Sequence, residues 1–127
     1  MILVDTSIWV DHLRSGDGFL TEMLSRGEVL MHPFVTGELA LGHIRQRDIL
    51  LRALSKLPQA VLATDREVLQ FIEVHALSGA GIGYIDAHLL AAVRLTAGAS
   101  FWTRDRRLFD VADRLALAAP ETRETKK

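Results

Sequence analysis

The sequence predicts an α/β protein of three layers, in which helices cover both faces of a parallel sheet. Five short apolar runs alternate with longer stretches whose apolar residues recur at helical spacing. Because one or two helices separate successive strands, the connections are expected to be right-handed crossovers between parallel strands. The 127 residues are enough for one such domain. We therefore expect a single domain over 1–119, followed by a polar tail over 120–127.

The five apolar runs predict five strands in the parallel sheet. Each run is short, and residues that end helices, such as Gly27 and Pro58, precede two of them. The predicted strands are Ile2–Val4, Val29–Met31, Ala60–Leu62, Ser100–Trp102 and Leu115–Ala118. In parallel sheets of this kind, functional residues collect beyond the carboxyl ends of the strands.

The stretches between the strands carry the signals that begin helices. Thr6 or Ser7 is expected to cap the first helix, and Pro33 to begin the third. Asp65 and Asp105 are expected to cap the fifth and the seventh, and a glycine-rich loop precedes the sixth. The predicted helices cover 6–13, 19–26, 33–44, 49–57, 65–77, 84–96 and 105–113.

The composition narrows the function classes. With 15 Lys and Arg against 16 Asp and Glu, the net charge of −1 provides no bulk attraction to nucleic acid or to anionic membranes. Any such binding has to be local. The absence of cysteine excludes disulfides and thiolate metal sites. The first residues do not resemble a signal peptide, and no apolar run approaches the roughly 20 residues of a membrane span. We therefore expect a cytoplasmic protein that makes no use of a membrane.

Four carboxylates occupy positions where chemistry is expected. Asp5 directly follows the first predicted strand and Asp105 closely follows the fourth, so both belong at the same rim of a parallel sheet. Glu38 and Asp86 each lie one helical turn from apolar residues, which puts a charge beside an apolar stripe. Taken singly, each acid has a plainer interpretation, because the aspartates suit helix starts and Glu38 suits a solvated surface.

Taken together, these carboxylates predict a metal site if they converge. Carboxylates at ~4 Å repel by about 4 kcal/mol per pair at an effective dielectric of about 20. The sequence offers no buried lysine to neutralise them, whereas a divalent cation would. Oxygen ligands favour Mg²⁺ or Mn²⁺ over zinc, and the five histidines show no zinc-ligand spacing. An open carboxylate cage of this type commonly serves phosphodiester hydrolysis.

Four segments of the chain surround the four acids. They are Val4-Asp5-Thr6-Ser7, Thr36-Gly37-Glu38-Leu39, Gly81-Ile82-Gly83-Tyr84-Ile85-Asp86-Ala87 and Trp102-Thr103-Arg104-Asp105-Arg106-Arg107-Leu108-Phe109. In order and spacing, the chain resembles the PIN-domain ribonucleases, specifically the VapC-type toxins of bacterial toxin-antitoxin pairs. The resemblance spans essentially the whole chain. It implies a PIN-like three-layer α/β/α fold with a five-stranded parallel sheet, and a toxin that hydrolyses RNA as an endoribonuclease dependent on Mg²⁺ or Mn²⁺.

The resemblance also implies roles for individual residues. Asp5, Glu38, Asp86 and Asp105 fall on the acidic quartet of the family, which binds the metal and carries the catalysis. Thr103 falls on the hydroxyl position beside the last acid. The water that attacks the phosphodiester bond is then activated by the metal that the four carboxylates hold.

Three arginines flank the last acid of the quartet. Arg104, Arg106 and Arg107 are expected to hold RNA phosphates, and the alternative is a solvated helix start. Asp110 lies more than one helical turn beyond the last acid and is expected to be a surface residue. Asp11 is likewise expected on the solvated face of the first helix.

The resemblance implies partners as well. A VapB-type antitoxin is expected to lay a C-terminal segment over the helices and to carry a basic side chain toward the acidic site. Such a side chain can occupy the field that Mg²⁺ would otherwise fill. A homodimer that binds two antitoxins is also implied. Exposed apolar positions on the second and fifth helices are the candidate dimer surfaces.

Two other function classes compete with this interpretation. A phosphoacceptor receiver domain has a similar length and strand-end acids, but it needs a lysine after its last strand. No lysine occurs here between Lys56 and Lys126. The other class is a catalytically silent PIN fold that works as an RNA-binding or scaffold module. The presence of all four acids argues against it, and metal-dependent cleavage of a structured RNA would separate the two.

Overall fold

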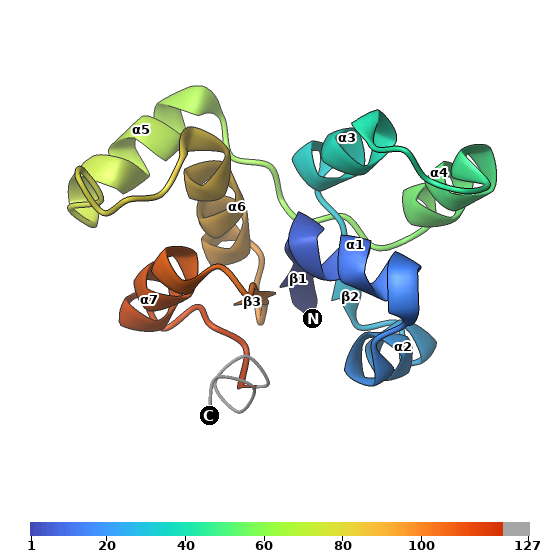
Figure 1. The fold of residues 1–127 in the computed structure, drawn as a ribbon. Helices are drawn as coiled ribbons and strands as arrows, with labels where there is room; N and C mark the ends of the chain where they lie inside the picture. The colour runs from blue at the N-terminus through green and yellow to red at the C-terminus, as the bar shows by residue number, and fades with distance from the viewer. Residues whose placement is uncertain (121–127) are drawn as a thin grey trace.

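A computed structural model describes residues 1–120, and Figure 1 shows their arrangement. Three parallel strands form the sheet: β1 (Ile2–Val4), β2 (Val29–Leu30) and β3 (Ser100–Trp102). Their order is β2-β1-β3, so the first strand of the chain lies in the middle. Because parallel neighbours need crossover connections, helices join these strands. The prediction of a parallel sheet is confirmed.

The prediction of five strands is wrong, because residues 1–120 form a sheet of three strands. The segments at the third and fifth predicted strands each make a single parallel bridge outside it, and in the first of these the bridging residue lies one position before the predicted strand. Met31, just after β2, bridges to Gln59, and Phe101 of β3 bridges to Ala118. The apolar runs therefore reach the two edges of the sheet without extending along them.

Local backbone chemistry explains why the two edge segments stop at a bridge. Pro58 has no N–H to donate, and the N–H of Val61 donates to the Thr96 hydroxyl at 2.9 Å instead of to a strand. At the other edge, Ala116 has a φ of 59°, a left-handed conformation that interrupts an extended chain. Apolar periodicity does not report either constraint.

Seven helices lie among the described residues, and Figure 1 shows α1 to α4 on one side of the strands and α5 to α7 on the other. They are α1 (Thr6–Ser15), α2 (Gly18–Ser25), α3 (Pro33–Leu41), α4 (Arg47–Ser55), α5 (Asp65–Val74), α6 (Tyr84–Leu95) and α7 (Arg106–Arg114). None of them is long and apolar enough to cross a membrane. The predicted polar tail lies outside the described residues after Pro120.

The caps of the helices differ in part from those predicted. Asp105 caps α7, as predicted. α1 is capped by Asp5 rather than by one of the hydroxyl side chains that follow it. α5 is capped by Thr64 in a capping box, and Asp65 is already its first helical residue. The carboxylate of Asp65 is therefore free of the capping role and contacts side chains of α6 instead.

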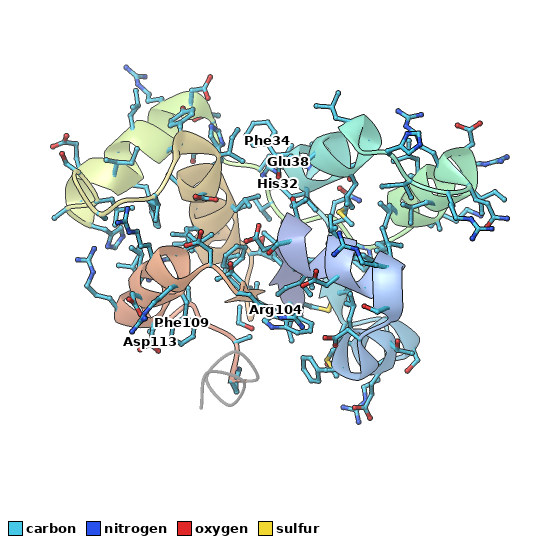
Figure 2. All side chains as sticks on the ribbon, viewed as in Figure 1. His32, Phe34, Glu38, Arg104, Phe109 and Asp113 are labelled. Atoms are coloured by element: carbon cyan, nitrogen blue, oxygen red, sulfur yellow. The ribbon has the colours of Figure 1, made fainter. Side chains whose placement is uncertain are left out.

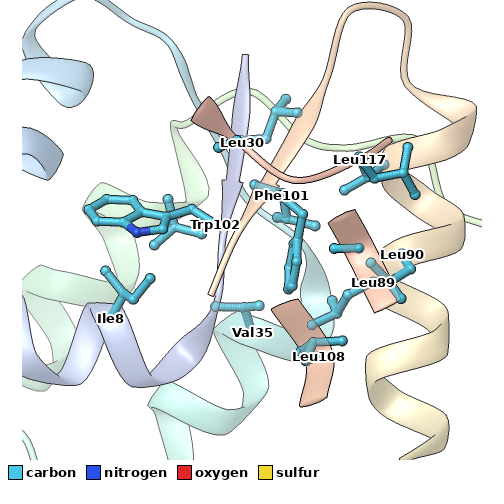
Figure 3. Packing of buried hydrophobic residues seen from close by; sticks show 14 of the residues in the cluster. Ile8, Leu30, Val35, Leu89, Leu90, Phe101, Trp102, Leu108 and Leu117 are labelled. Atoms are coloured by element: carbon cyan, nitrogen blue, oxygen red, sulfur yellow. The ribbon is translucent and has the colours of Figure 1, made fainter. Parts of the chain in front are cut away.

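The core holds β3 between the two groups of helices. Its aromatic residues Phe101 and Trp102 are 0% and 1% exposed. Figure 3 shows Ile8 of α1 beside Trp102, and Leu89 and Leu108 beside Phe101. Burying one such side chain stabilises the fold by roughly 1.5–3 kcal/mol. This packing anchors the end of β3, from which the chain enters the candidate site.

Candidate active site

The carboxyl ends of β1 and β3 place Asp5 and Thr103 side by side. The strands pair in register up to Val4 and Trp102, and the N–H of Asp5 donates to the carbonyl of Trp102 at 2.9 Å. The Thr103 hydroxyl then donates to Oδ2 of Asp5 at 2.7 Å and accepts from the N–H of Asp105 at 3.1 Å. Thr103 is 1% exposed, so this polar contact lies within the packed interior.

Glu38 reaches the same place from α3. The Thr6 hydroxyl, at the start of α1, donates to Oε1 of Glu38 at 2.6 Å. The start of α3 is set by His32, whose Nδ1 accepts the N–H of Phe34 at 3.0 Å. Burial, followed by the nearby charge of His88, lowers the pKa of His32 to about 4. The ring is therefore neutral at pH 7 and free to accept this hydrogen bond.

Asp86 enters the site from the first turn of α6. Its Oδ2 accepts the N–H of Gly83 at 3.1 Å, which satisfies an unpaired donor of the helix start. Asp5 and Asp105 are the cap residues of α1 and α7, and their carboxylates accept backbone N–H bonds there. The plainer interpretation of the three aspartates, as two caps and one acid at a helix start, is therefore correct in geometry, and it coexists with a second role.

That second role is indicated by a single pocket of about 370 Å³. Its lining brings together all four predicted acids with two hydroxyl residues and one arginine: Asp5, Thr6, Ser7, Glu38, Asp86, Arg104 and Asp105. The acids come from the end of β1, from α3, from α6 and from the turn after β3. Arg106 and Arg107 stand outside this lining, and so does Asp110, which is exposed as predicted.

The pocket concentrates negative charge. Burial raises the pKa of Asp5; hydrogen bonds from Thr103 and Thr6 oppose the increase, and the charges of Asp86 and Glu38 add to it. The pKa of Asp86 is raised in the same direction, by burial first and then by the charges of Asp105 and Glu38. Both shifts mean that ionising these carboxyls costs free energy in the folded chain.

The donor chemistry of the pocket fits a hard divalent cation. Within residues 1–120, no three carboxylate or imidazole groups are already arranged as an ion site. However, the side-chain hydrogen bonds of Glu38, Asp86 and Asp105 each use one carboxylate oxygen, which leaves the other oxygen for a cation. A cation there would offset the burial and the neighbouring charges that raise the pKa values of Asp5 and Asp86.

Comparison with known proteins decides the family. The PIN domain family matches residues 2–115. The chain belongs to the PIN domain family. It is also 50% identical over 108 residues to the "Ribonuclease VapC32" proteins of two strains of Mycobacterium tuberculosis, CDC 1551 / Oshkosh and ATCC 25618 / H37Rv. Each match covers 85% of this chain and 87% of the relative. The predicted resemblance to VapC-type PIN proteins is confirmed, and a receiver domain is set aside.

The arginines of this PIN domain differ in their surroundings. Arg104 is held by two carboxylates, with its guanidinium 2.7 Å from Asp11 and 2.7 Å from Asp17. Figure 2 shows it beside α1. Arg107 lies across Gly81, where an added Cβ would come within 2.8 Å of its Cδ. Glycine at this position, with a φ of +82°, allows the arginine to lie against the loop.

Sequence reasoning missed two groups in this PIN domain. Asp11 was expected on a solvated face, and it is instead half-exposed in an ion pair with Arg104. Asp17 was not singled out at all. No local signal identifies either partner, because the two pairs join residues separated by 93 and 87 positions.

Proposed function

We propose that this PIN domain is a metal-dependent endoribonuclease and the toxin of a toxin-antitoxin pair, acting in the cytoplasm. The observation that carries the proposal is the acidic pocket, where four carboxylates from four parts of the chain meet and two of them have raised pKa values. The name of the two mycobacterial relatives, Ribonuclease VapC32, supports it.

In the proposed mechanism, Asp5, Glu38, Asp86 and Asp105 would hold Mg²⁺ or Mn²⁺. When bound there, the ion would supply an activated water and polarisation of the scissile phosphate. The residues around it have separate tasks. By donating to Oδ2 of Asp5, the Thr103 hydroxyl orients that carboxylate.

Two further contacts orient carboxylates of the pocket. The Thr6 hydroxyl does for Glu38 what Thr103 does for Asp5, since it donates to Oε1 at 2.6 Å. The N–H of Gly83 holds one oxygen of Asp86 and so fixes its rotation. Because these donors belong to helix starts and to a strand end, the carboxylates are held by rigid elements rather than by loops.

The test of the proposed function is cleavage of a structured RNA by the full chain. We expect cleavage in Mg²⁺ or Mn²⁺ and none in excess EDTA, because the proposed ligands are hard oxygens. Cleavage that persists in EDTA would exclude the mechanism. Metal-independent RNA binding without any cleavage would favour the alternative, a catalytically silent RNA-binding or scaffold module.

Arg106 and Arg107 are proposed to hold RNA phosphates on the approach to the pocket. Both lie in the first turn of α7, directly after Asp105, and neither is engaged in an ion pair among the described residues. Replacing either one by alanine should weaken RNA binding and reduce the slope of log K against log salt by about one. Binding isotherms at several salt concentrations measure this slope. An unchanged slope for both variants would assign them to a solvated helix start.

The partners proposed for this toxin are a VapB-type antitoxin and a second copy of the chain. A basic side chain of the antitoxin would find four carboxylates in one pocket, where it could compete with the cation. Adding the antitoxin should therefore weaken Mn²⁺ binding as well as stop cleavage. Inhibition with unchanged Mn²⁺ affinity would mean that the antitoxin acts away from the pocket.

A further inference from the structure

Arg104 occupies an unusual place among the residues of the acidic pocket. It lines the pocket, and its chain neighbours Thr103 and Asp105 both belong to the proposed site. Yet its guanidinium is directed to carboxylates outside the pocket, with Nη1 at 2.7 Å from Oδ2 of Asp11 and Nη2 at 2.7 Å from Oδ2 of Asp17. Two of its N–H donors are therefore already used, and two carboxylates already offset its charge, which weakens its attraction for a phosphate.

Both partners of Arg104 are themselves fixed. Asp11 lies within α1, and Asp17 caps α2 by accepting the N–H of Leu20 on its other oxygen at 2.9 Å. The backbone N–H of Asp17 also donates to Nδ1 of His12 at 3.0 Å. The side chain of Asp17 is only 17% exposed. The arginine therefore joins the turn after β3 to two anchored points, one within α1 and one at the cap of α2.

The second side of Arg104 rests on β3 itself. Its guanidinium carbon lies 5.9 Å from the ring centroid of Trp102, a residue that is 1% exposed. A planar guanidinium that lies within cation-π range of an aromatic ring and donates one N–H bond to each of two carboxylates has few other orientations available. Lysine could keep the charge at this position, but it could not keep this geometry.

Arg104 adds a point of attachment between the turn at 103–105 and α1. The turn at 103–105 meets the start of α1 through the Thr103 hydroxyl and Asp5. Beside it, the N–H of Asp5 donates to the carbonyl of Trp102, so both of these contacts hold the turn at the end of β1. The ion pair of Arg104 with Asp11, further along α1, attaches the turn at a second point, and attachments at two separate points fix its orientation and hence that of Asp105.

We propose that Arg104 is a positioning residue, held by Asp11 and Asp17, that fixes the turn carrying Thr103 and Asp105 against α1. On this proposal it does not bind RNA phosphate, and phosphate binding rests on Arg106 and Arg107. The kinetic part of the proposal depends on the proposed ribonuclease function. The structural part does not.

The expected effect is on the site rather than on the stability of the fold. Arg104 and Asp11 are half-exposed, and ion pairs of this kind contribute little to the free energy of unfolding. A loosened turn, in contrast, misplaces a proposed metal ligand. Loss of such an outer partner typically lowers metal affinity or activity by about 10- to 100-fold.

The kinetic test uses substitutions for which a positioning role and a phosphate-binding role of Arg104 predict different results. If Arg104 positions the turn, Arg104→Lys and Asp11→Asn should each lower kcat about tenfold and leave KM for RNA nearly unchanged. If Arg104 binds phosphate, Arg104→Lys should be nearly silent, and Asp11→Asn should release the arginine and tighten RNA binding. Arg104→Gln adds a further check, because positioning predicts an unchanged salt dependence of RNA binding. A reduced salt slope for Arg104→Gln would overturn the proposal.

A second readout does not need any RNA. The N–H of Asp105 is bonded to Thr103, so its hydrogen exchange reports whether the turn is fixed. Arg104→Lys and Asp11→Asn should accelerate exchange at Asp105 by about tenfold, with unchanged exchange at the α3 amide of Thr36. The matched control is Arg26→Lys, which alters an exposed ion pair with Glu22. It should change hydrogen exchange neither at Asp105 nor at Thr36.

The exchange measurement decides the outcome. Unchanged exchange at Asp105 in both variants overturns the proposal whatever the kinetics show. If the parent chain cleaves no RNA in Mg²⁺ or Mn²⁺, the proposed ribonuclease function fails, while faster exchange at Asp105 still supports the positioning role.

Discussion

Two clusters of polar side chains flank the start of α6, namely the acidic pocket and the group formed by Asp65, Tyr84 and His88, and their environments are opposite. In the acidic pocket, Asp86 lies among other carboxylates and accepts a hydrogen bond from the backbone N–H of Gly83. On the other side lies Asp65, at the start of α5. Its Oδ1 accepts a hydrogen bond from the Tyr84 hydroxyl at 2.9 Å and lies 3.0 Å from Nε2 of His88. Both clusters join helix starts, but only in the second one do side-chain groups of α6 contact the carboxylate and stabilise its charge.

The pKa shifts follow this difference. The hydrogen bond from Tyr84, followed by the one from His88, lowers the pKa of Asp65, because both favour the ionised carboxylate. Burial and neighbouring acids raise the pKa of Asp86. Tyr84 and His88 therefore stabilise the charge of Asp65 within this chain, whereas in the proposed mechanism a cation stabilises the charge of the acidic pocket.

The largest expected effect separates the two clusters by activity. Asp5→Asn removes one ligand charge at constant side-chain size and should lower RNA cleavage by more than about 100-fold, the upper range for losing an outer partner of a metal. Asp65→Asn is the matched control and should change cleavage by about twofold at most, as surface substitutions do. Initial rates with the same RNA and saturating Mn²⁺ measure both. Equal losses in the two variants would remove the distinction between the clusters.

An intermediate effect concerns stability without metal. The raised pKa of Asp86 means that the folded chain binds its proton more tightly than the unfolded chain, so its contribution to stability is lost as pH rises through the folded pKa. In EDTA near pH 8, Asp86→Asn should therefore raise Tm by about 1–3 °C, since partial exposure screens the repulsion. Asparagine can still accept the N–H of Gly83, so the helix start is preserved.

The same variant should respond less to added metal. Mn²⁺ binds the folded chain and raises the Tm of the parent, and Asp86→Asn should show a smaller rise. Thermal melts of parent and variant, in EDTA and in Mn²⁺, give both comparisons. A variant that melts below the parent in EDTA and keeps the full Mn²⁺ response would mean that Asp86 does not share a charge-crowded site with the other acids.

The smallest effect is expected at Asp65. Its lowered pKa gives a stability contribution that is present above the pKa of the unfolded chain and is lost as pH falls through the folded pKa. Asp65→Asn should therefore lower Tm by about 1 °C near pH 7, because the carboxylate is exposed. The difference from the parent should vanish once the pH has fallen below the folded pKa of Asp65, and Tyr84→Phe should reproduce part of it. A difference that grows at low pH would contradict this assignment.

Much of the site was predictable because it depends on strand ends and helix starts. Asp5 and Asp105 follow strands in the sequence, and parallel strands bring their carboxyl ends to one rim. For Glu38 and Asp86, the sequence pattern gave convergence with them only as a condition, and the resemblance to the PIN-domain ribonucleases implied it. The cap of α5 was not predictable, because Thr64 and Asp65 are both good cap residues and the choice depends on where Tyr84 and His88 lie.

The sequence by itself determined a parallel α/β domain with its acids at the strand ends, because apolar periodicity and strand-helix order are local properties of the chain. Only the tertiary structure decided where the sheet ends, because the N–H of Val61 donates to the Thr96 hydroxyl and not to a neighbouring strand. It also decided the partners of Arg104. Ion pairs across 93 and 87 positions depend on how α1, α2 and β3 pack, and no spacing in the sequence records that packing.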